Sequence, residues 1–182
     1  MASPNIANAL RRSLLIKVIS KPTPSREDLD SVIELTATKV VEALQAQSMT
    51  FYLIEGNDIT FRHVYYSPTL WGKDKEKEKK FQATQAKLLE LKLPLGTGNV
   101  GKVITTGEPL FFTKNGPDGD SLMSMTKTTG FEISSMLTVP LKGETVIGAV
   151  QVLNKEPSAG TEGEFTDRDL VLRRKSPSIR RR

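Results

Sequence analysis

Two pairs of strand-like segments, each joined by a tight turn, limit most strongly what this chain can fold into. The first pair covers residues 49–55 and 59–66 around a Gly-Asn-Asp turn, and the second covers residues 134–141 and 145–154 around a Lys-Gly-Glu turn. Segments rich in β-branched and aromatic residues on both sides of such turns are typical of β-hairpins. The sequence therefore predicts an antiparallel sheet.

Helical segments flank and separate the two hairpins. Apolar side chains recur at three- and four-residue steps over residues 4–20 and 29–44, which is the spacing of one helix face. A Pro-Thr-Pro sequence ends the first segment, because proline lacks a backbone donor. Ser25 followed by Asp28 fits a variant of the capping box at the start of the second. Further helices are predicted over residues 73–91, 99–106 and 165–172, with a strand and a long loop (114–128) after the second of them.

Cysteine and histidine are almost absent. The 182 residues include no Cys and a single His, His63. This excludes disulfide scaffolds, thiolate zinc sites, cysteine nucleophiles and multi-histidine metal sites. We expect no enzyme, no metal and no cofactor, and we interpret His63 as a structural strand residue rather than a haem ligand. Strict strand alternation would place it on one face with Phe61 and Tyr65, and Arg62, Val64 and Tyr66 on the other.

The net charge of +5 is concentrated at one end of the chain. Residues 173–182 hold six cations and no acid, whereas residues 1–172 carry 20 basic and 21 acidic side chains. A basic segment interrupted by proline and without aromatic residues for base stacking is typical of a solvated chain end. We therefore expect no nucleic-acid partner.

Length and hydropathy suggest one domain with short extensions. We expect an N-terminal helix and Pro-rich connection over residues 1–24, a main folded domain over 25–172, and a basic tail over 173–182 that marks a boundary or a truncation. No apolar run approaches the roughly 20 residues that a membrane span needs. The first residues lack the features of a secretory signal. We expect a cytoplasmic protein with no membrane partner.

Three glycines, Gly96, Gly98 and Gly101, have the spacing of a dinucleotide-binding loop. Such a loop needs a buried parallel strand before it, a crossover helix of usual length after it, and an acidic residue about 20 positions further on. Here the following helix is cut short at Gly107 and the acidic position falls in a loop. We interpret the glycines as a tight turn that leads into a short helix.

The element order and several motifs resemble the GAF domains, the small-molecule and protein-interaction modules of signalling proteins. The resemblance covers residues 29–172 and is carried by Gly98–Gly101, Thr106–Leu110, Thr129–Phe131 and Ser135–Lys155. It is strongest to the regulatory GAF domains of cyclic-nucleotide phosphodiesterases and cyclases and of bacterial signalling proteins. The predicted fold is α+β: a central antiparallel sheet, N- and C-terminal helices on one face, and a pocket loop with short helices on the other.

The resemblance also implies a ligand pocket and a structural brace. The positions matching the family's ligand-binding residues are Thr50, Tyr65, Tyr66, Asn99, Val100, Thr126, Thr129 and Gln151. The amides of Asn99 and Val100 begin the short helix, and the N-terminus of a helix suits an anion. The motif residues Asn154, Lys155, Phe165 and Asp169 imply a brace, in which an ion pair between Lys155 and Asp169 ties the last strand to the last helix.

Several departures from the nucleotide-binding members argue against a purine ligand. Gln151 stands where those members often have an acid, Thr126 and Leu122 stand in place of an acid and an aromatic residue, and Ile133 replaces a hydroxyl. Each unmatched polar group on a buried ligand costs about 1–3 kcal/mol. We expect a smaller or more apolar ligand, or an empty pocket.

These observations predict a regulatory, small-molecule-sensing and dimerisation domain of a larger signalling protein. The expected partners are a second copy, bound through the flanking helices, and a covalently linked output domain. Two alternatives remain open. The chain could be a pure interaction module whose pocket is filled by Leu122, Met123 and Met125, or a cyclic-nucleotide-binding GAF domain.

Overall fold

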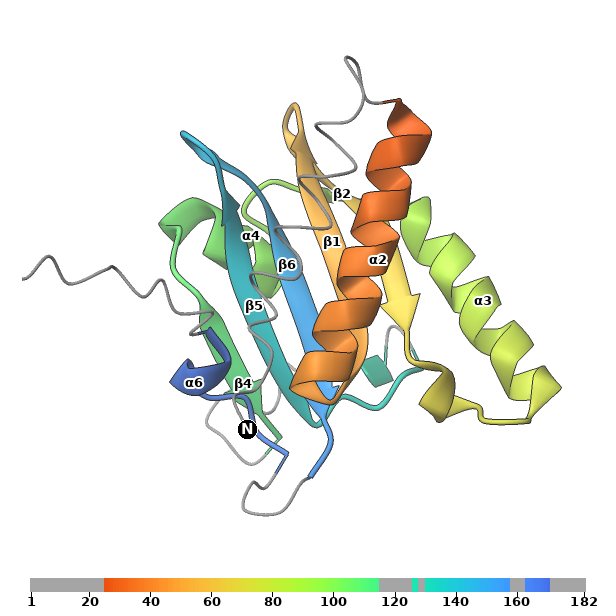
Figure 1. The fold of residues 1–182 in the computed structure, drawn as a ribbon. Coiled ribbons are helices and arrows are strands. Elements are labelled where there is room, and N and C mark those ends of the chain that lie inside the picture. Colours follow the sequence, from red (N-terminus) through yellow and green to blue (C-terminus); the bar gives the residue numbers. More distant parts are fainter. Residues whose placement is uncertain (1–24, 115–125, 128–129, 158–162, 171–182) are drawn as a thin grey trace, which may run out of the picture.

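One six-stranded antiparallel sheet organises the chain (Figure 1). The computed structural model describes residues 25–114, 126–127, 130–157 and 163–170. The strand order is β3-β2-β1-β6-β5-β4, and each strand runs antiparallel to its neighbours. The strands are β1 (Ala46–Glu55), β2 (Asp58–Tyr66), β3 (Lys92–Pro94), β4 (Leu110–Thr113), β5 (Ser135–Lys142) and β6 (Val146–Lys155). The predicted hairpins are β1–β2 and β5–β6, so the long strands of both lie at the centre of the sheet.

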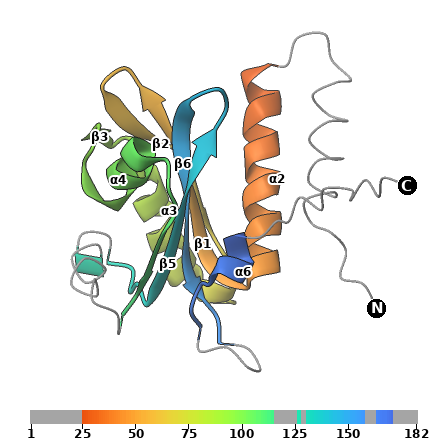
Figure 2. The same cartoon turned by 90° about the vertical axis from the view of Figure 1, so that its left-hand side faces the viewer.

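Helices cover both faces of the sheet (Figure 2). The long helix α2 (Arg26–Leu44) and the short α6 (Asp167–Leu170) lie on one face, while α4 (Gly98–Thr106) covers the other. The helix α3 (Lys75–Leu89) packs against β2, and a short 3-10 helix, η1 (Pro68–Leu70), joins β2 to it. The predicted capping box at the start of α2 is present, since the Ser25 hydroxyl accepts from the amide of Asp28 and the carboxylate of Asp28 accepts from the amide of Ser25.

The core divides into two layers, one on each side of the sheet. Beneath α2, a cluster includes Ala37 and Val41 of the helix with Met49, Val150 and Val152 of the strands. On the opposite face, α4 and the residues before β5 pack over the other side chains of the same strands. Because strand side chains alternate between faces, one sheet serves two apolar layers.

The predicted α+β fold and its arrangement of helices are confirmed. The structure adds β3, a three-residue edge strand that pairs with the start of β2 and that the sequence did not indicate. The strand predicted after the short helix is β4. The predicted helix over 4–20, most of the loop over 114–128 and the basic tail over 173–182 lie outside the described residues, so the division of the chain into these parts stays a prediction.

A β-bulge in β2 corrects the predicted alternation of this strand. Phe51 of β1 faces His63, but the next residue, Tyr52, faces Phe61, so Arg62 is an extra residue without a partner in β1. The bulge moves Phe61 to the α4 side of the sheet. Arg62 turns to the opposite side and forms an ion pair with Asp30 of α2. Strict alternation was wrong here because one inserted residue reverses the faces of all residues before it.

The glycine-rich segment forms the tight turn expected from the sequence. Gly96 and Gly98 have positive φ values of 88° and 64°, which side chains other than glycine rarely adopt. The backbone then folds back so closely that a Cβ on Gly101 would lie 2.7 Å from the Cα of Gly96. The spacing of these glycines is therefore explained by close packing of a turn against the first turn of α4.

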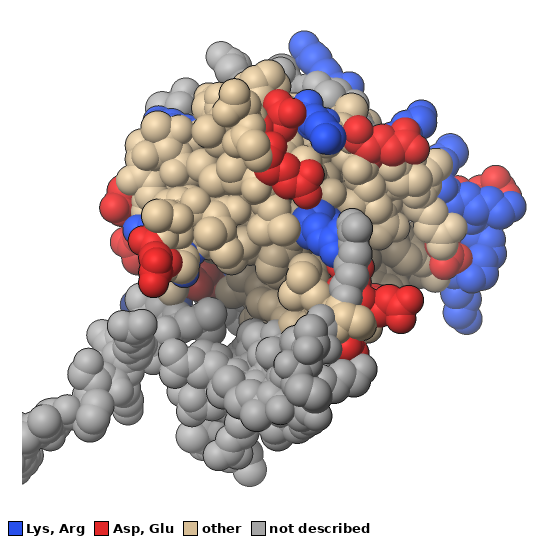
Figure 3. All heavy atoms as spheres, turned by 90° about the horizontal axis from the view of Figure 1, so that it is seen from above, with Lys and Arg blue, Asp and Glu red and all other residues tan. Residues whose placement is uncertain are grey.

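Charged side chains are distributed over the surface. On the face seen in Figure 3, Lys and Arg side chains are interspersed with Asp and Glu. Within the described part of the chain, no helix has the length and apolar character needed to cross a bilayer.

Candidate functional site

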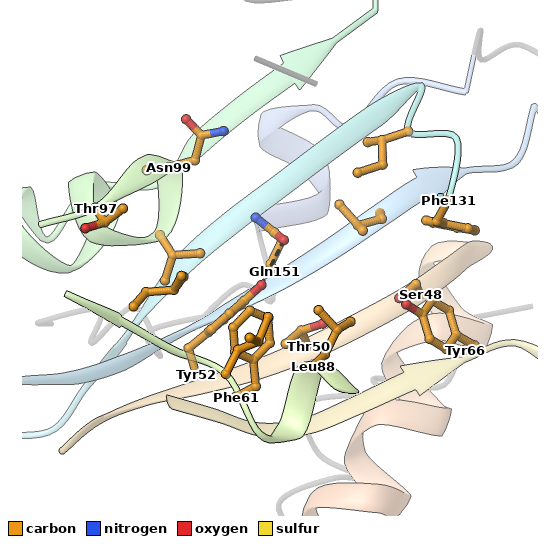
Figure 4. Close-up of a pocket in the computed structure, with 16 residues that line it drawn as sticks. Ser48, Thr50, Tyr52, Phe61, Tyr66, Leu88, Thr97, Asn99, Phe131 and Gln151 are labelled. Atoms are coloured by element: carbon orange, nitrogen blue, oxygen red, sulfur yellow. Dashed lines mark hydrogen bonds between the residues drawn. The ribbon is translucent and has the colours of Figure 1, made fainter. Parts of the chain in front are cut away.

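A cavity of about 390 Å³ lies between the sheet and the segments that cover its α4 face. Its floor comes from β1, β2 and β6, and its walls come from the end of α3, the start of α4 and the residues before β5 (Figure 4). The described lining residues are Ser48, Thr50, Tyr52, Phe61, Tyr66, Leu88, Leu91, Leu93, Thr97, Gly98, Asn99, Val100, Phe131, Ile133, Gln151 and Leu153.

Gln151 anchors a small polar network in the floor of the cavity. Its side chain is 1% exposed, and its Oε1 accepts a hydrogen bond of 3.2 Å from the hydroxyl of Tyr52. Its Nε2 donates to the hydroxyl of Thr138, at 3.1 Å. These bonds fix both ends of the amide, which Figure 4 shows at the centre of the floor. A buried amide satisfied in this way holds one orientation and gives the cavity a defined polar point.

The two tyrosines of the floor are neutral hydrogen-bonding groups. Burial raises the pKa of Tyr66 to about 12, and burial also raises the pKa of Tyr52 far above its usual range. Both phenols therefore stay protonated at all physiological pH values. The ring of Tyr52 packs at 4.8 Å from that of Phe61, so the wall beside its hydroxyl is aromatic.

The described residues that line the cavity are uncharged. None of the sixteen described lining residues is Asp, Glu, Lys, Arg or His. The polar side chains are hydroxyls and amides, and the remaining lining is aliphatic or aromatic. Such a surface suits an uncharged molecule, because a buried charge without a partner is strongly disfavoured.

Five of the eight predicted ligand-binding residues line this cavity: Thr50, Tyr66, Asn99, Val100 and Gln151. Tyr65 does not, because it lies on the α2 side of the sheet and packs against the cluster beneath that helix. Thr126 is also not among the lining residues, and its hydroxyl accepts a hydrogen bond from the amide of Ile133. Thr129 lies outside the described residues. The role of all eight in binding stays a prediction.

Sequence reasoning missed several lining residues. Ser48 and Tyr52 stand two positions on either side of Thr50, so strand alternation alone could have identified them. Phe61 was missed because the bulge at Arg62 is invisible to strict alternation. Leu88 and Leu91 were missed because they reach the cavity through the packing of α3 rather than through a motif.

The motif expected to act as a brace connects β6 to α6. Lys155 Nζ lies 2.7 Å from Asp169 Oδ1, and each of the two side chains is 11% exposed. The ammonium group also lies 6.0 Å from the ring centre of Phe165. Asn154, with a positive φ of 55°, accepts from the amide of Ser134 and donates to Gln47 of β1. These contacts are the ones that a structural brace requires, and the structural role of the four residues stays a prediction.

His63 lies on the α2 side of β2, away from this cavity. Burial lowers the pKa of its imidazole, and the carboxylates of Glu34 and Asp30 oppose that effect in part. Among the described residues, no group of three or more His, Asp or Glu side chains could hold a metal ion.

Comparisons with known proteins agree with this architecture. Residues 28–173 match the model of the GAF domain family. Among solved structures, the GAF domain of a Coxiella burnetii phosphoenolpyruvate-protein phosphotransferase has a TM-score of 0.57 at 15% identity, over 92% of this chain and 85% of that one. A GAF domain/HD domain protein from Geobacter sulfurreducens gives 0.56 at 18% identity, over 79% and 82%. The free methionine-R-sulfoxide reductase of Neisseria meningitidis, solved with its substrate, gives 0.53 at 16%, over 94% and 85%.

Proposed function

Because the chain belongs to the GAF domain family, we propose that it is a regulatory, ligand-sensing domain of a larger signalling protein, with no catalysis of its own. GAF domains are commonly regulatory domains of signalling proteins. The observation that carries the proposal is the cavity of about 390 Å³ between the sheet and α4. A cavity of this size, mostly apolar with a few fixed polar groups, has the features of a small-molecule site.

The lining favours a small, uncharged and largely apolar ligand. Gln151 and Tyr52 already satisfy each other, so a ligand gains little by competing for them. The hydroxyls of Ser48 and Thr50 then provide polar contacts at the floor, while Leu88, Val100 and Ile133 provide apolar walls. Apolar burial of about 25 cal/mol per Å² supplies the affinity, and the hydroxyls orient the ligand.

A cyclic nucleotide fits the lining less well. Its phosphate would face the amides at the start of α4, near Gly98 and Asn99, without a cation among the described lining residues. Helix N-terminal amides stabilise an anion, but they compensate only part of the cost of burying its charge. We therefore rank a cyclic nucleotide below an uncharged ligand.

An enzymatic role has little chemical support. One structural neighbour is a methionine sulfoxide reductase, but this chain contains no cysteine for thiol-based reduction. No acid or base lines the cavity among the described residues, so its chemistry is restricted to hydroxyls and amides. Binding without reaction is the role that these groups support.

Ligand binding can reach the flanking helices through β6. Gln151 and Leu153 of this strand line the cavity, whereas Val150 and Val152 pack in the cluster beneath α2. The strand ends at Lys155, which is paired with Asp169 of α6. A ligand that shifts β6 therefore changes how α2 and α6 pack. If the ligand binds more tightly to one arrangement of these helices than to another, it shifts the population toward that arrangement.

Exposed apolar side chains on α2 support the proposed dimer. Leu29 and Leu35 of α2 are 47% and 36% exposed, so this helix offers apolar side chains to a second copy. The competing function is a pure interaction module that dimerises without a ligand. A measurement of ligand binding and mass on the same sample separates the two functions.

The test is a thermal-shift screen combined with light scattering after size exclusion. The panel contains small uncharged apolar metabolites, cyclic AMP and cyclic GMP. A ligand at about 100 times its dissociation constant stabilises the fold by about 2.7 kcal/mol, which is a shift of several degrees. Ser48→Leu, which fills the cavity, should abolish the shift, and Ser31→Leu on the exposed face of α2 should not. A dimer mass with no shift for any compound would support the interaction module instead.

A further inference from the structure

A second, smaller crevice lies beside the outer edge of β2, between this strand and the helices α2 and α3. Among the described strands, β3 is the outer neighbour of β2, and it pairs only with Asp58, Ile59 and Thr60, so the rest of this edge has no described strand beside it. The amide of Gln85 on α3 covers this edge by donating a 2.6 Å hydrogen bond to the carbonyl of Val64. Between α2, β2 and α3 a crevice of about 220 Å³ remains. It is lined by Glu34, His63, Tyr65, Tyr66, Pro68, Trp71, Phe81, Gln82 and Gln85.

Aromatic rings make up much of the crevice wall. Trp71 and Phe81 have ring centres 5.6 Å apart, and Phe81 lies 5.0 Å from Tyr66. The contacts between the rings hold them in place, so the wall is formed before a ligand arrives. Preformed aromatic faces attract organic cations through their quadrupoles, with tryptophan the strongest of the three ring types Trp, Tyr and Phe.

The charges around the crevice favour a cation. Glu34 of α2 has an exposed carboxylate at the rim of the crevice. Among the described lining residues, no other side chain than that of Glu34 is an acid, Lys or Arg. Next to it, Asp30 and Arg62 neutralise each other in an ion pair. The described lining residues therefore carry a net charge of one negative unit, next to aromatic rings. This lining differs from that of the main cavity, whose described residues are aromatic, apolar or polar but uncharged.

His63 contributes an unused hydrogen-bonding atom. Its Nε2 is buried and has no hydrogen-bond partner. Because burial lowers the pKa of the imidazole, the ring is neutral near pH 7, and in one tautomer Nε2 can accept a hydrogen bond. A buried polar atom without a partner carries a free-energy cost that a bound donor would remove.

We propose that this crevice binds a small organic molecule with a primary ammonium group. The ammonium charge faces Glu34, one of its N–H groups donates to Nε2 of His63, and its hydrocarbon part lies against Trp71 and Phe81. The site is separate from the main cavity, although Tyr66 contributes to the lining of both. The protein would then respond to two chemically different ligands, one on each side of β2.

The single tryptophan of the chain gives a selective readout. Trp71 lines the crevice and not the main cavity, so its fluorescence reports on this site. The probe is butylammonium chloride, with 1-butanol as the neutral isostere and sodium chloride at equal ionic strength. The variants are Glu34→Gln, His63→Phe, and the control Glu42→Gln, whose carboxylate lies further along α2 outside the crevice lining. Circular dichroism verifies that each variant folds.

We expect a saturable fluorescence change with butylammonium and none with butanol or sodium chloride. Glu34→Gln should weaken the apparent affinity about fivefold to tenfold, because it removes a charge-assisted contact, and Glu42→Gln should leave it unchanged. His63→Phe should weaken it by a similar factor. Saturation-transfer-difference NMR on butylammonium detects binding that leaves the Trp71 fluorescence unchanged. No signal in either experiment, an equal response to butanol, or full affinity in Glu34→Gln or His63→Phe would overturn the proposal.

Discussion

At the scale of single residues, Gln151 determines the chemical character of the cavity floor. A carboxylate at this position would bring a buried charge, whereas the amide accepts from Tyr52 and donates to Thr138 without one. The floor is therefore polar, neutral and internally paired. This pairing is the reason for expecting an uncharged ligand rather than one that needs a buried acid or base.

Replacing Gln151 by leucine should destabilise the fold by about 1–3 kcal/mol, because two buried hydroxyls lose their partner. Tyr52→Phe in the same chain should restore part of that loss by removing one of the unpaired groups. The measurement is urea unfolding of the two single variants and the double variant. Strictly additive changes in the free energy of unfolding would contradict the network, because coupled residues are not additive.

His63 should make the fold less stable as the pH falls. Its pKa is lowered in the folded state, mainly by burial and against the pull of Glu34 and Asp30. Below the unfolded value of about 6.5, the unfolded chain takes up a proton that the folded chain resists, so the free energy of unfolding decreases. Above that pH the effect disappears.

The comparison is between the wild type and His63→Gln. Between about pH 7.5 and about pH 5.5, the wild type should lose more stability than the variant, because only the wild type carries the buried imidazole. Chemical unfolding at the two pH values gives the difference. Equal losses in the two proteins would show that the imidazole has the same pKa folded and unfolded.

At the scale of elements, the hairpins and helices were predictable from the sequence and the bulge was not. Turn residues and the alternation of apolar residues act locally, so they identified β1, β2, β5 and β6. Arg62 is the extra residue of the bulge, and its ion-pair partner Asp30 is on α2, 32 positions away in the chain. The bulge brought Phe61 to the cavity, whereas Tyr65 follows the bulge and faces α2 because it alternates with Tyr66. Local sequence patterns do not reveal a contact between residues so far apart in the chain.

Gly101 should be irreplaceable in the turn that precedes α4. An alanine Cβ would collide with the backbone of Gly96, which cannot move without opening the turn. We expect Gly101→Ala to cost about 1–3 kcal/mol through overpacking. Lys102→Ala, on the exposed side of the same helix, should change stability by less than about 0.5 kcal/mol. The measurement is thermal unfolding of the two variants. Similar midpoints would show that the close contact between Gly101 and the backbone of Gly96 does not contribute to stability.

The ion pair between Lys155 and Asp169 should stabilise the attachment of α6 to the sheet. Lys155→Met keeps much of the aliphatic stem but leaves the mostly buried carboxylate without its cation, at a cost of about 2 kcal/mol. The control is Lys114→Met, which removes the exposed pair with Glu132 and should leave stability nearly unchanged. Urea midpoints measure both effects. The brace would be refuted if the two substitutions had equal consequences.

At the scale of the whole molecule, the sheet separates two layers of side chains that share the same strands. One face holds the cavity, and the other carries α2 and α6, so β6 contacts both layers. The sequence motifs predicted this division and five of the lining residues. They could not predict that the described lining residues are all uncharged, because the walls include Leu88 of α3 and Leu93 of β3, which reach the cavity only through tertiary packing.

The most direct test of the central claim is methyl NMR of the protein titrated with each compound of the screening panel. The account predicts that one small uncharged compound shifts the methyl signals of Val100, Ile133 and Leu153, which face the cavity. The methyls of Leu137 and Val152, beneath α2, should respond less. Largest shifts beneath α2, or no shift with any compound, would contradict the assignment of this cavity as the sensing site.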